Sequence, residues 1–269
     1  MTRLRLGLGL LGLLVVAAFA APLLGQDSAA PDLFNRYAAP SAAHWLGTDD
    51  LGRDLLVRLL EGARVSLTVG VATALAAGLI GTAAGMLAAW RGGVVDALVM
   101  RLADGLLALP ALPLLVVLAA VDPAVVGLPR GQAASDMIRI VGILTLFGWV
   151  GVARLARAAA LSVLARDHVR AARALGVTEA RLLLRHVLPA LAVPVSVATA
   201  LAVAGAILAE STLSFLGLGI APPNPSWGNM LANAQELVFS APMAAVWPGL
   251  AILMAVAGCT LVADGVRAR

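Results

Sequence analysis

Long apolar runs, each about as long as a membrane-crossing helix, alternate with short polar segments along the whole chain. They cover residues 6–24, 65–90, 97–121, 137–160, 187–209 and 237–263. A helix rises about 1.5 Å per residue, so about 20 residues cross a hydrocarbon core that is ~30 Å thick. The pattern therefore predicts an all-α polytopic membrane protein with about six transmembrane helices.

Composition indicates that lipid, not water, surrounds most of this chain. Hydrophobic residues make up 61% of its 269 residues and charged residues 13%, and the mean hydropathy is +0.96. Charged residues are about 25% of an ordinary soluble domain, so a water-soluble globular protein is excluded. Within the second run, Ala77, Gly81 and Gly85 recur at four-residue spacing, which predicts close packing against a neighbouring helix.

The distribution of arginine predicts the orientation of the spans. The chain contains no lysine, so all 19 of its basic residues are arginine. The loops on the side of the two termini carry most of them, and seven lie between Arg154 and Arg185. Loops rich in arginine stay in the cytoplasm, so we expect both termini to be cytoplasmic. The alternative for the first run is a signal peptide cleaved after Ala18-Phe19-Ala20, although this run is longer than the usual apolar core.

Residues that carry catalytic or metal chemistry are few and scattered. The single cysteine, Cys259, excludes an internal disulfide, and His44, His168 and His186 lack the spacing of metal ligands. No glycine-rich phosphate loop of the G-x-x-x-x-G-K-[ST] type is present. We therefore expect neither an enzyme nor a chain that binds ATP, a metal or another cofactor itself.

The basic segment between the fourth and fifth runs is too long for a simple connection, since helices in bundles are usually joined by 2–8 residues. Alanine, leucine and arginine dominate it, which favours helix, and Gly176 interrupts the pattern before Pro189. We expect two short helices that meet at Gly176. Two interpretations remain: a docking surface for a cytoplasmic partner, or an amphipathic helix that lies on anionic lipid.

Three stretches, in the same order as in a known family, resemble the permease subunits of ATP-binding-cassette importers for dipeptides, oligopeptides and nickel. The first runs from His44 through Gly47, Thr48, Asp49, Gly52 and Arg53 to Asp54. The second joins Arg170-Ala171-Ala172-Arg173-Ala174-Leu175-Gly176 to His186-Val187-Leu188-Pro189, and is similar to the importers' pattern Glu-Ala-Ala-x-x-x-Gly followed by Ile-x-Leu-Pro. The third runs from Ser214 through Gly219 and Pro222 to Gly228.

The resemblance implies that the second stretch is a coupling helix that inserts into a cytoplasmic ATPase subunit. Arg170 stands where the pattern has glutamate, and His186 stands where it has isoleucine. The small side chains of the stretch let a partner approach its backbone closely. Gly176 permits a tight exit from the helix. The remaining residues of the expected docking surface are Ala171, Ala172, Arg173, Ala174, Leu175, Leu188 and Pro189.

The first stretch predicts a short periplasmic helix over residues 48–61. Thr48 is expected to cap this helix, with Asp49 in its first turn, and Asp54 is expected to pair with Arg58. Its role is either structural, at the outer gate, or a contact to a substrate receptor. Further along, Trp227 is expected to anchor a proline-rich periplasmic connection at the membrane interface.

Two acids fall within the predicted spans, where an uncompensated charge costs about 2.5–3.5 kcal/mol. Asp104 lies near the cytoplasmic boundary and is expected to pair locally, close to Arg101. Glu210 lies near the periplasmic end of the fifth run, where it either recognises the amino terminus of a peptide or a metal cation, or bonds to a neighbouring helix. Both acids are candidates for the translocation path or gate.

Taken with the resemblance, the sequence predicts a type I importer permease in a bacterial inner membrane. The expected divisions are a first helix over 1–25, a periplasmic segment over 26–64, a transmembrane domain over 65–264 with its coupling loop at 160–189, and a cytoplasmic tail over 265–269. The implied partners are a second permease, two ATPase subunits that bind ATP and Mg²⁺, and a substrate-binding protein. Nickel or another small solute remains an alternative cargo. An ion-coupled secondary transporter is the rival class, but it calls for inverted repeats that we do not find.

Overall fold

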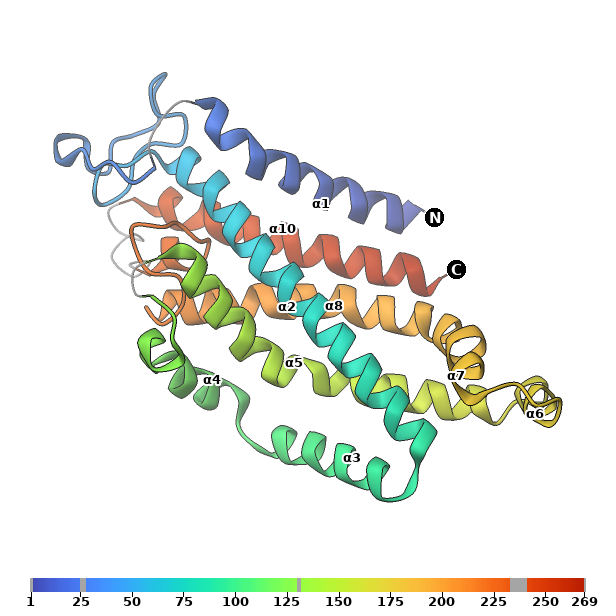
Figure 1. The fold of residues 1–269 in the computed structure, drawn as a ribbon. Helices are drawn as coiled ribbons and strands as arrows, with labels where there is room; N and C mark the ends of the chain where they lie inside the picture. Colours follow the sequence, from blue (N-terminus) through green and yellow to red (C-terminus); the bar gives the residue numbers. More distant parts are fainter. Residues whose placement is uncertain (1, 25–27, 130–131, 233–240, 269) are drawn as a thin grey trace.

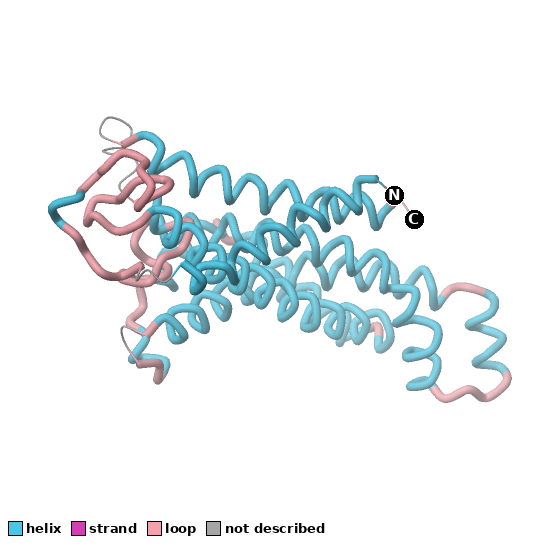
Figure 2. Tube along the Cα trace, turned by 90° about the horizontal axis from the view of Figure 1, so that it is seen from above, coloured by secondary structure: helices cyan, strands magenta, loops and turns pink. Residues whose placement is uncertain are grey.

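Five long helices lie side by side and form the body of the molecule (Figure 1). The computed structural model describes residues 2–24, 28–129, 132–232 and 241–268. Figure 2 shows that helices account for almost all regular structure in these ranges, and they contain no strand beyond an isolated bridge between Thr48 and Asp54. The long helices are α1 (Thr2–Ala20), α2 (Leu55–Arg91), α5 (Ala133–Leu164), α8 (Leu188–Phe215) and α10 (Pro242–Arg267).

Shorter helical segments join the long ones. They are η1 (Ala21–Leu24), η2 (Leu33–Asn35), α3 (Gly93–Ala108), α4 (Ala111–Ala119), η3 (Pro123–Val126), α6 (Asp167–Ala174), α7 (Glu179–Leu182), the π-helical η4 (Leu183–Val187) and η5 (Asn229–Leu231). The first four residues of the predicted sixth span, 237–240, lie outside the described residues, and the helix that carries the rest begins at Pro242.

The number of candidate spans is five, or six when α3 and α4 are taken as one bent span. This confirms the all-α membrane fold with about six crossings. The predicted third span, 97–121, is not a straight helix, because α3 and α4 meet at 87°. Leu109 at the break is extended, with φ −82° and ψ 141°. A residue that precedes a proline is kept out of the helical region, and Pro110 has no N–H for a helical hydrogen bond.

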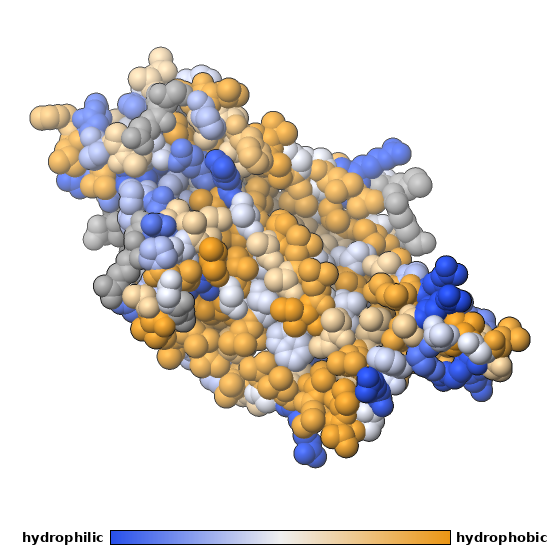
Figure 3. All heavy atoms as spheres, viewed as in Figure 1, coloured by the Kyte–Doolittle hydropathy of each residue, from blue (hydrophilic) through white to orange (hydrophobic). Residues whose placement is uncertain are grey.

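The two ends of the bundle differ. The start of α1, the end of α10, α6 and α7 lie at one end, which we call the inner end (Figure 1). The loop 28–54 and residues 216–232 after α8 lie at the opposite, outer end. Figure 3 shows hydrophobic residues over the middle of the visible face and hydrophilic residues gathered toward both ends. This is the pattern expected when lipid surrounds the middle and water surrounds the ends.

Small residues bring the long helices into close contact. A Cβ atom added at Gly81 or Gly85 of α2 would lie 2.5 Å or 2.2 Å from a backbone carbonyl oxygen of α5. Between α1 and α10, a Cβ atom at Gly7 would lie 2.8 Å from the carbonyl oxygen of Gly258. The packing predicted from the glycine spacing of α2 is therefore confirmed, and α5 is the partner helix.

Candidate functional site

The coupling segment, residues 160–189, forms a helix, a turn and a second helix at the inner end. Helix α6 ends in a Schellman turn. The N–H of Gly176 donates to the carbonyl of Arg173 (3.0 Å), and that of Val177 donates to the carbonyl of Ala172 (3.2 Å). Gly176 itself is left-handed, with φ 79°, and no atom lies within 4 Å of the position of an added Cβ. A side chain there would therefore strain the backbone without meeting a neighbour.

Apolar side chains hold the inner face of the coupling segment against the bundle. Val169 of α6, Leu182 of α7 and Val187 of η4 are fully buried. They belong to one cluster with Ala156 and Ala160 of α5. Because these anchors occupy one side only, the opposite side of the segment is free to meet a partner.

The opposite side presents the motif residues to solvent. Arg170, Arg173, Ala174 and Gly176 are exposed, and Leu175 is 85% exposed. The guanidinium of Arg170 pairs with Asp167 of its own helix, at 2.6 Å. Small, apolar and cationic groups thus share one accessible surface beside a backbone turn.

Glu179 connects the parts of the coupling segment, a role that the sequence analysis did not predict. Its carboxylate accepts hydrogen bonds from Arg173 of α6 at 2.9 Å and 3.2 Å. The indole N–H of Trp90, at the inner end of α2, donates to the same carboxylate at 3.2 Å. One side chain therefore connects α6, α7 and α2. Trp90 and Glu179 are 89 positions apart in the sequence, so no local periodicity could reveal their contact.

The second half of the motif lies where the coupling segment enters α8. Pro189 lies where the π-helical η4 passes into α8, within a helical stretch that runs from Glu179 to Phe215. His186 is half-buried in η4, and its ring centroid lies 6.0 Å from that of His168. The fold thus brings together two histidines that are 18 residues apart. They form no metal site among the described residues, which contain no cluster of three or more suitable ligands.

Ion pairs join α3 to α5 near the inner end and correct one expectation. Asp104 was expected to pair locally, beside Arg101, but its carboxylate pairs with Arg154 of α5. Asp96 pairs in the same way with Arg157. Asp104 is also exposed on the surface of α3. The partner of an acid across a helix pair depends on helix packing, which local sequence spacing does not report.

Glu210 lies inside the bundle near its outer end and is fully buried. Its two carboxylate oxygens accept hydrogen bonds from Ser66 of α2 (2.9 Å) and Ser214 of α8 (2.6 Å). The Ser66 hydroxyl also accepts the backbone N–H of Trp227 at 3.2 Å. Glu210 thus has the arrangement of the second alternative above, a carboxylate bonded to a neighbouring helix.

Trp227 was expected at the membrane interface, and this expectation is wrong. The side chain is fully buried, and its indole N–H donates to the carbonyl of Leu59 on α2 at 3.1 Å. Gly228 beside it lies against α8, since an added Cβ would be 2.5 Å from the carbonyl oxygen of Ser211. The outer connection is therefore clamped between α2 and α8. An isolated tryptophan in a proline-rich segment gives no signal of such burial.

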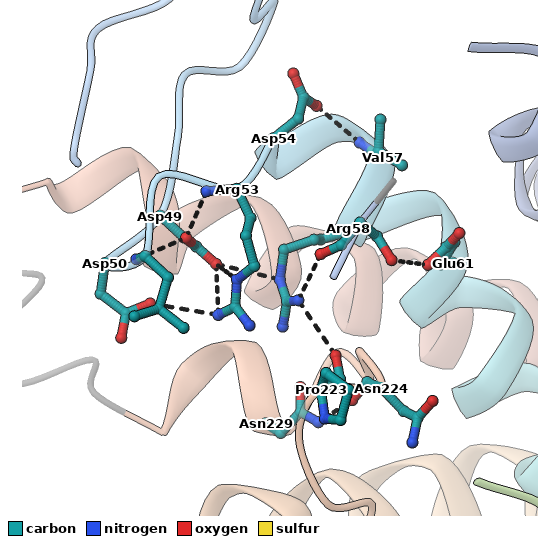
Figure 4. A network of polar contacts seen from close by, with 12 residues as sticks. Asp49, Asp50, Arg53, Asp54, Val57, Arg58, Glu61, Pro223, Asn224 and Asn229 are labelled. Atoms are coloured by element: carbon teal, nitrogen blue, oxygen red, sulfur yellow. Dashed lines mark hydrogen bonds and ion pairs between the residues drawn. The ribbon is translucent and has the colours of Figure 1, made fainter. Parts of the chain in front are cut away.

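The outer motif forms a compact polar network rather than the first turn of a helix (Figure 4). Asp49 lies between two arginines: one carboxylate oxygen is 2.7 Å from Nη2 of Arg53 and 3.2 Å from Nε of Arg58. Its other oxygen accepts the backbone N–H groups of Leu51 and Arg53, each at 2.9 Å. The predicted pair of Asp54 with Arg58 is replaced by this pair of Asp49 with Arg58.

Asp54, not Thr48, caps α2, which corrects the predicted helix start. The Asp54 side chain accepts the N–H of Val57 at 2.9 Å, and its other oxygen lies 2.9 Å from Nδ1 of His44. Thr48 lies in the preceding loop, where its hydroxyl accepts the N–H of Ala38 at 2.8 Å. The helix that begins at Leu55 continues unbroken into the second span, so no separate periplasmic helix exists over 48–61.

Two glycines of the outer motif fit places where no side chain would. Gly47 and Gly52 both have positive φ, 83° and 76°. A Cβ atom on Gly52 would lie 1.8 Å from the carbonyl oxygen of Asp32, and one on Gly47 would lie 2.5 Å from that of Ala38. The loop 28–54 is thus folded tightly on itself.

The buried network also joins this loop to the outer connection. Nη1 of Arg58 donates to the carbonyl of Ser28 at 3.0 Å and lies 3.4 Å from that of Pro223. Earlier in the same connection, the carbonyls of Leu218 and Gly219 accept hydrogen bonds from the guanidinium of Arg139 on α5, each at 3.2 Å. We call the loop 28–54 and the connection 216–232 together the outer cap.

Comparison with known proteins places this architecture in a family. Residues 81–269 match the family described as "Binding-protein-dependent transport system inner membrane component". The chain is 37% identical to a dipeptide transport system permease protein, DppC, of Alkalihalophilus pseudofirmus, over 97% of this chain and 84% of the relative. It is 36% identical to the oligopeptide permease protein OppC of Bacillus subtilis, over 97% and 82%.

A third relative is the glutathione transport system permease protein GsiD of Pectobacterium atrosepticum, which is 35% identical over 97% of this chain and 83% of the relative. The family match and the whole-chain similarities agree with the expectation from the three motifs. The chain belongs to the inner-membrane components of binding-protein-dependent transport systems and is the non-catalytic, multi-pass permease component of such an importer.

Proposed function

We propose that this chain forms half of the translocation path of an ATP-driven importer for peptides. The observation that carries the proposal is the exposed surface of the coupling segment beside the left-handed Gly176. In this proposal a cytoplasmic ATPase subunit binds that surface, and a second permease supplies the other half of the path. ATP and Mg²⁺ are bound by two such ATPase subunits.

The peptide cargo rests on the relatives, whose names refer to dipeptides, oligopeptides and glutathione. In this proposal a binding protein delivers the peptide to the outer end, and the permease provides a path and conformational coupling without covalent chemistry. Glu210 and Asp104 remain candidates for the path or gate. If Glu210 binds cargo, the Glu210→Gln variant transports peptide more slowly. Unchanged uptake assigns Glu210 a structural role only.

The proposed orientation places the inner end in the cytoplasm. It is supported by the excess of arginine at that end and by the shared location of the termini and the coupling segment. A reporter enzyme fused after Arg269 should be active only when it is one that functions in the cytoplasm. A reporter that functions only in the periplasm should be inactive there, and the reverse result would contradict the orientation.

The test of coupling is the Gly176→Val variant in the reconstituted importer. Valine at a left-handed position costs about 1–2 kcal/mol, so the turn that presents α6 changes shape. We expect ATP hydrolysis to lose its stimulation by the loaded binding protein, and transport to stop. The matched control is Gly12→Val on α1, where an added Cβ meets no neighbour and φ is not positive. Stimulated hydrolysis that survives Gly176→Val would overturn the docking assignment.

A further inference from the structure

Two hollows meet on the surface between α1 and α2, near the outer end. The first, which we call the α1–α2 groove, has a volume of about 370 Å³ and an apolar lining that runs from Phe19 and Val15 of α1 to Leu75 of α2. The second is a more polar cavity of about 380 Å³, lined in part by Glu61 and by Asn224 of the outer cap. Both share Ala18, Arg64 and Thr68 in their linings. The two hollows therefore lie next to each other, with Arg64 between them.

The length of the groove matches the depth of one membrane leaflet. Arg64 and Leu75 are eleven residues apart on α2, which corresponds to about 16 Å along a helix axis. Half of a ~30 Å hydrocarbon core is about 15 Å. Helix α1 ends at Ala20, so it leaves the hydrocarbon region close to the level of Arg64. The groove thus extends from the boundary of the membrane to about its middle.

Charged groups of both signs lie where the groove adjoins the polar cavity. Arg64 is exposed, and its guanidinium lies 5.8 Å from the centre of the Phe19 ring. Among the described residues, no hydrogen bond or ion pair involves this guanidinium. Glu61, three residues earlier on α2, is half-buried, and one of its carboxylate oxygens accepts the hydroxyl of Ser28. The other oxygen has no hydrogen-bond partner in the described ranges.

We propose that the groove and the cavity together hold one phospholipid whose headgroup carries a primary ammonium. A guanidinium matches the charge and geometry of a phosphate, which places the phosphate at Arg64. A carboxylate one helical turn away matches an ammonium, which places the amine of phosphatidylethanolamine at Glu61. One acyl chain lies in the apolar groove, against Phe19 and Leu75.

A bound lipid would link three parts of the protein. A lipid in this place contacts α1, α2 and the outer cap at once, because all three line the cavity. It would fill the space between α1 and α2 that side chains leave open. The site is distinct from the coupling segment, which lies at the opposite end of the bundle (Figure 1).

The experiment uses the assembled importer, purified in detergent, exposed to a mixture of phosphatidylethanolamine, phosphatidylglycerol and phosphatidylcholine, and measured by native mass spectrometry. We expect one phosphatidylethanolamine to remain bound per copy of this chain. Arg64→Ala should weaken binding at least about tenfold, because a charged hydrogen bond to the phosphate is lost. Arg64→Lys should keep part of the affinity. The control is Arg101→Ala, which removes an exposed arginine of α3 outside the site.

Two further variants separate the headgroup from the acyl chain. Glu61→Gln should keep a bound lipid but abolish the preference for phosphatidylethanolamine over phosphatidylglycerol. Ala72→Trp should fill the groove and displace the lipid, whereas Leu79→Trp, farther along the exposed face of α2, should not. Addition of phosphatidylethanolamine should raise the unfolding temperature of the wild type but not of Ala72→Trp.

Several outcomes would overturn the proposal. Equal retention of lipid by wild type, Arg64→Ala and Ala72→Trp would show that the bound lipid lies elsewhere. Equal retention of all three headgroups by the wild type would remove the role of Glu61. A photo-crosslinker at residue 72 that captures another subunit of the importer rather than lipid would assign the groove to a protein contact.

Discussion

The two ends of this molecule treat charged residues in opposite ways. In the outer cap, the buried Arg53 and Arg58 both pair with the buried carboxylate of Asp49. In the coupling segment, Arg170 and Arg173 are exposed and pair with Asp167 and Glu179 of the same segment. The outer cap therefore pairs its charges in its interior, whereas the coupling segment carries its arginines on an exposed surface.

Because the ion pairs are buried at one end and exposed at the other, breaking them costs different amounts of free energy. Removing one member of a buried ion pair leaves an unpaired charge in a site that excludes water, which is strongly unfavourable. Removing one member of an exposed pair costs little, because water replaces the lost partner. We therefore expect substitutions in the outer cap to change stability, and substitutions in the coupling segment to change communication with the ATPase subunits.

The largest expected effect on stability comes from Asp49→Ala. This change leaves Arg53 and Arg58 without their shared acceptor, and we expect a loss of about 3–5 kcal/mol. Thermal unfolding of the purified importer measures it. The control is Asp50→Ala, because Asp50 is about one-third exposed and lies 3.5 Å from Arg53, so its loss should cost less than about 1 kcal/mol. Equal unfolding temperatures of the two variants would show that burial of the network is not decisive.

A smaller effect is expected from Ser66→Ala, which removes one hydroxyl between α2, α8 and the outer connection. That hydroxyl donates to Glu210 and accepts from Trp227, so its loss should cost about 1–3 kcal/mol. Thermal unfolding is again the measurement. Thr212→Ala is the matched control, since its exposed hydroxyl donates to the Leu208 carbonyl of its own helix. A larger loss in the control than in Ser66→Ala would refute this account of Glu210.

Glu179→Ala should have a modest effect on stability and a clear effect on coupling. The pair with Arg173 is about half-exposed, so its loss should cost less than about 1 kcal/mol. The variant also separates α6 and α7 from Trp90, so we expect the binding protein to stimulate ATP hydrolysis less. Asp264→Ala, which removes a half-exposed ion pair with Arg3 at the same end, should leave stimulation unchanged. The same stimulation in both variants would show that Glu179 does not transmit motion.

The smallest effect on stability is expected from Arg170→Ala. Its pair with Asp167 lies on the surface, so the unfolding temperature should not change measurably. The ATPase subunit should nevertheless bind the permease several-fold more weakly, as measured by its retention during purification. Alanine in place of the exposed Arg5 of α1 is the control. Unchanged retention would limit the docking surface to the residues around Gly176.

The sequence predicts the features that depend on local composition. Apolar runs of sufficient length identify the spans, and the glycines of α2 identify a packing face, because both follow directly from the geometry of a helix in lipid. The turn at Gly176 is equally local, since a single glycine after a helical stretch determines the left-handed exit. The fold class and the positions of five long helices were therefore accessible from the sequence.

The contacts between distant residues were not accessible in this way. Arg154 pairs with Asp104 across 50 positions, and Trp227 reaches α2 across 168 positions. Each of these contacts depends on how helices are placed next to one another. Tertiary contacts also decide that Asp54 rather than Thr48 caps α2. In the folded loop the Thr48 hydroxyl already accepts from the N–H of Ala38 and donates to the carbonyl of Asn35. The break before Pro110 has a local cause, the proline itself, but the sequence analysis treated 97–121 as one span and did not predict it.

Helix α2 has a mechanical consequence. Its 37 residues contain no proline, and they extend for about 55 Å, well beyond the ~30 Å hydrocarbon core. Arg58, near one tip, is bound into the outer cap, and Trp90, near the other, is bound to Glu179. A rod without a hinge cannot move at one tip alone. If a partner tilts α2 at Trp90, the opposite end of the helix moves as well. The ion-paired loop around Arg58, on the other side of the membrane, must then change its conformation or move with the helix.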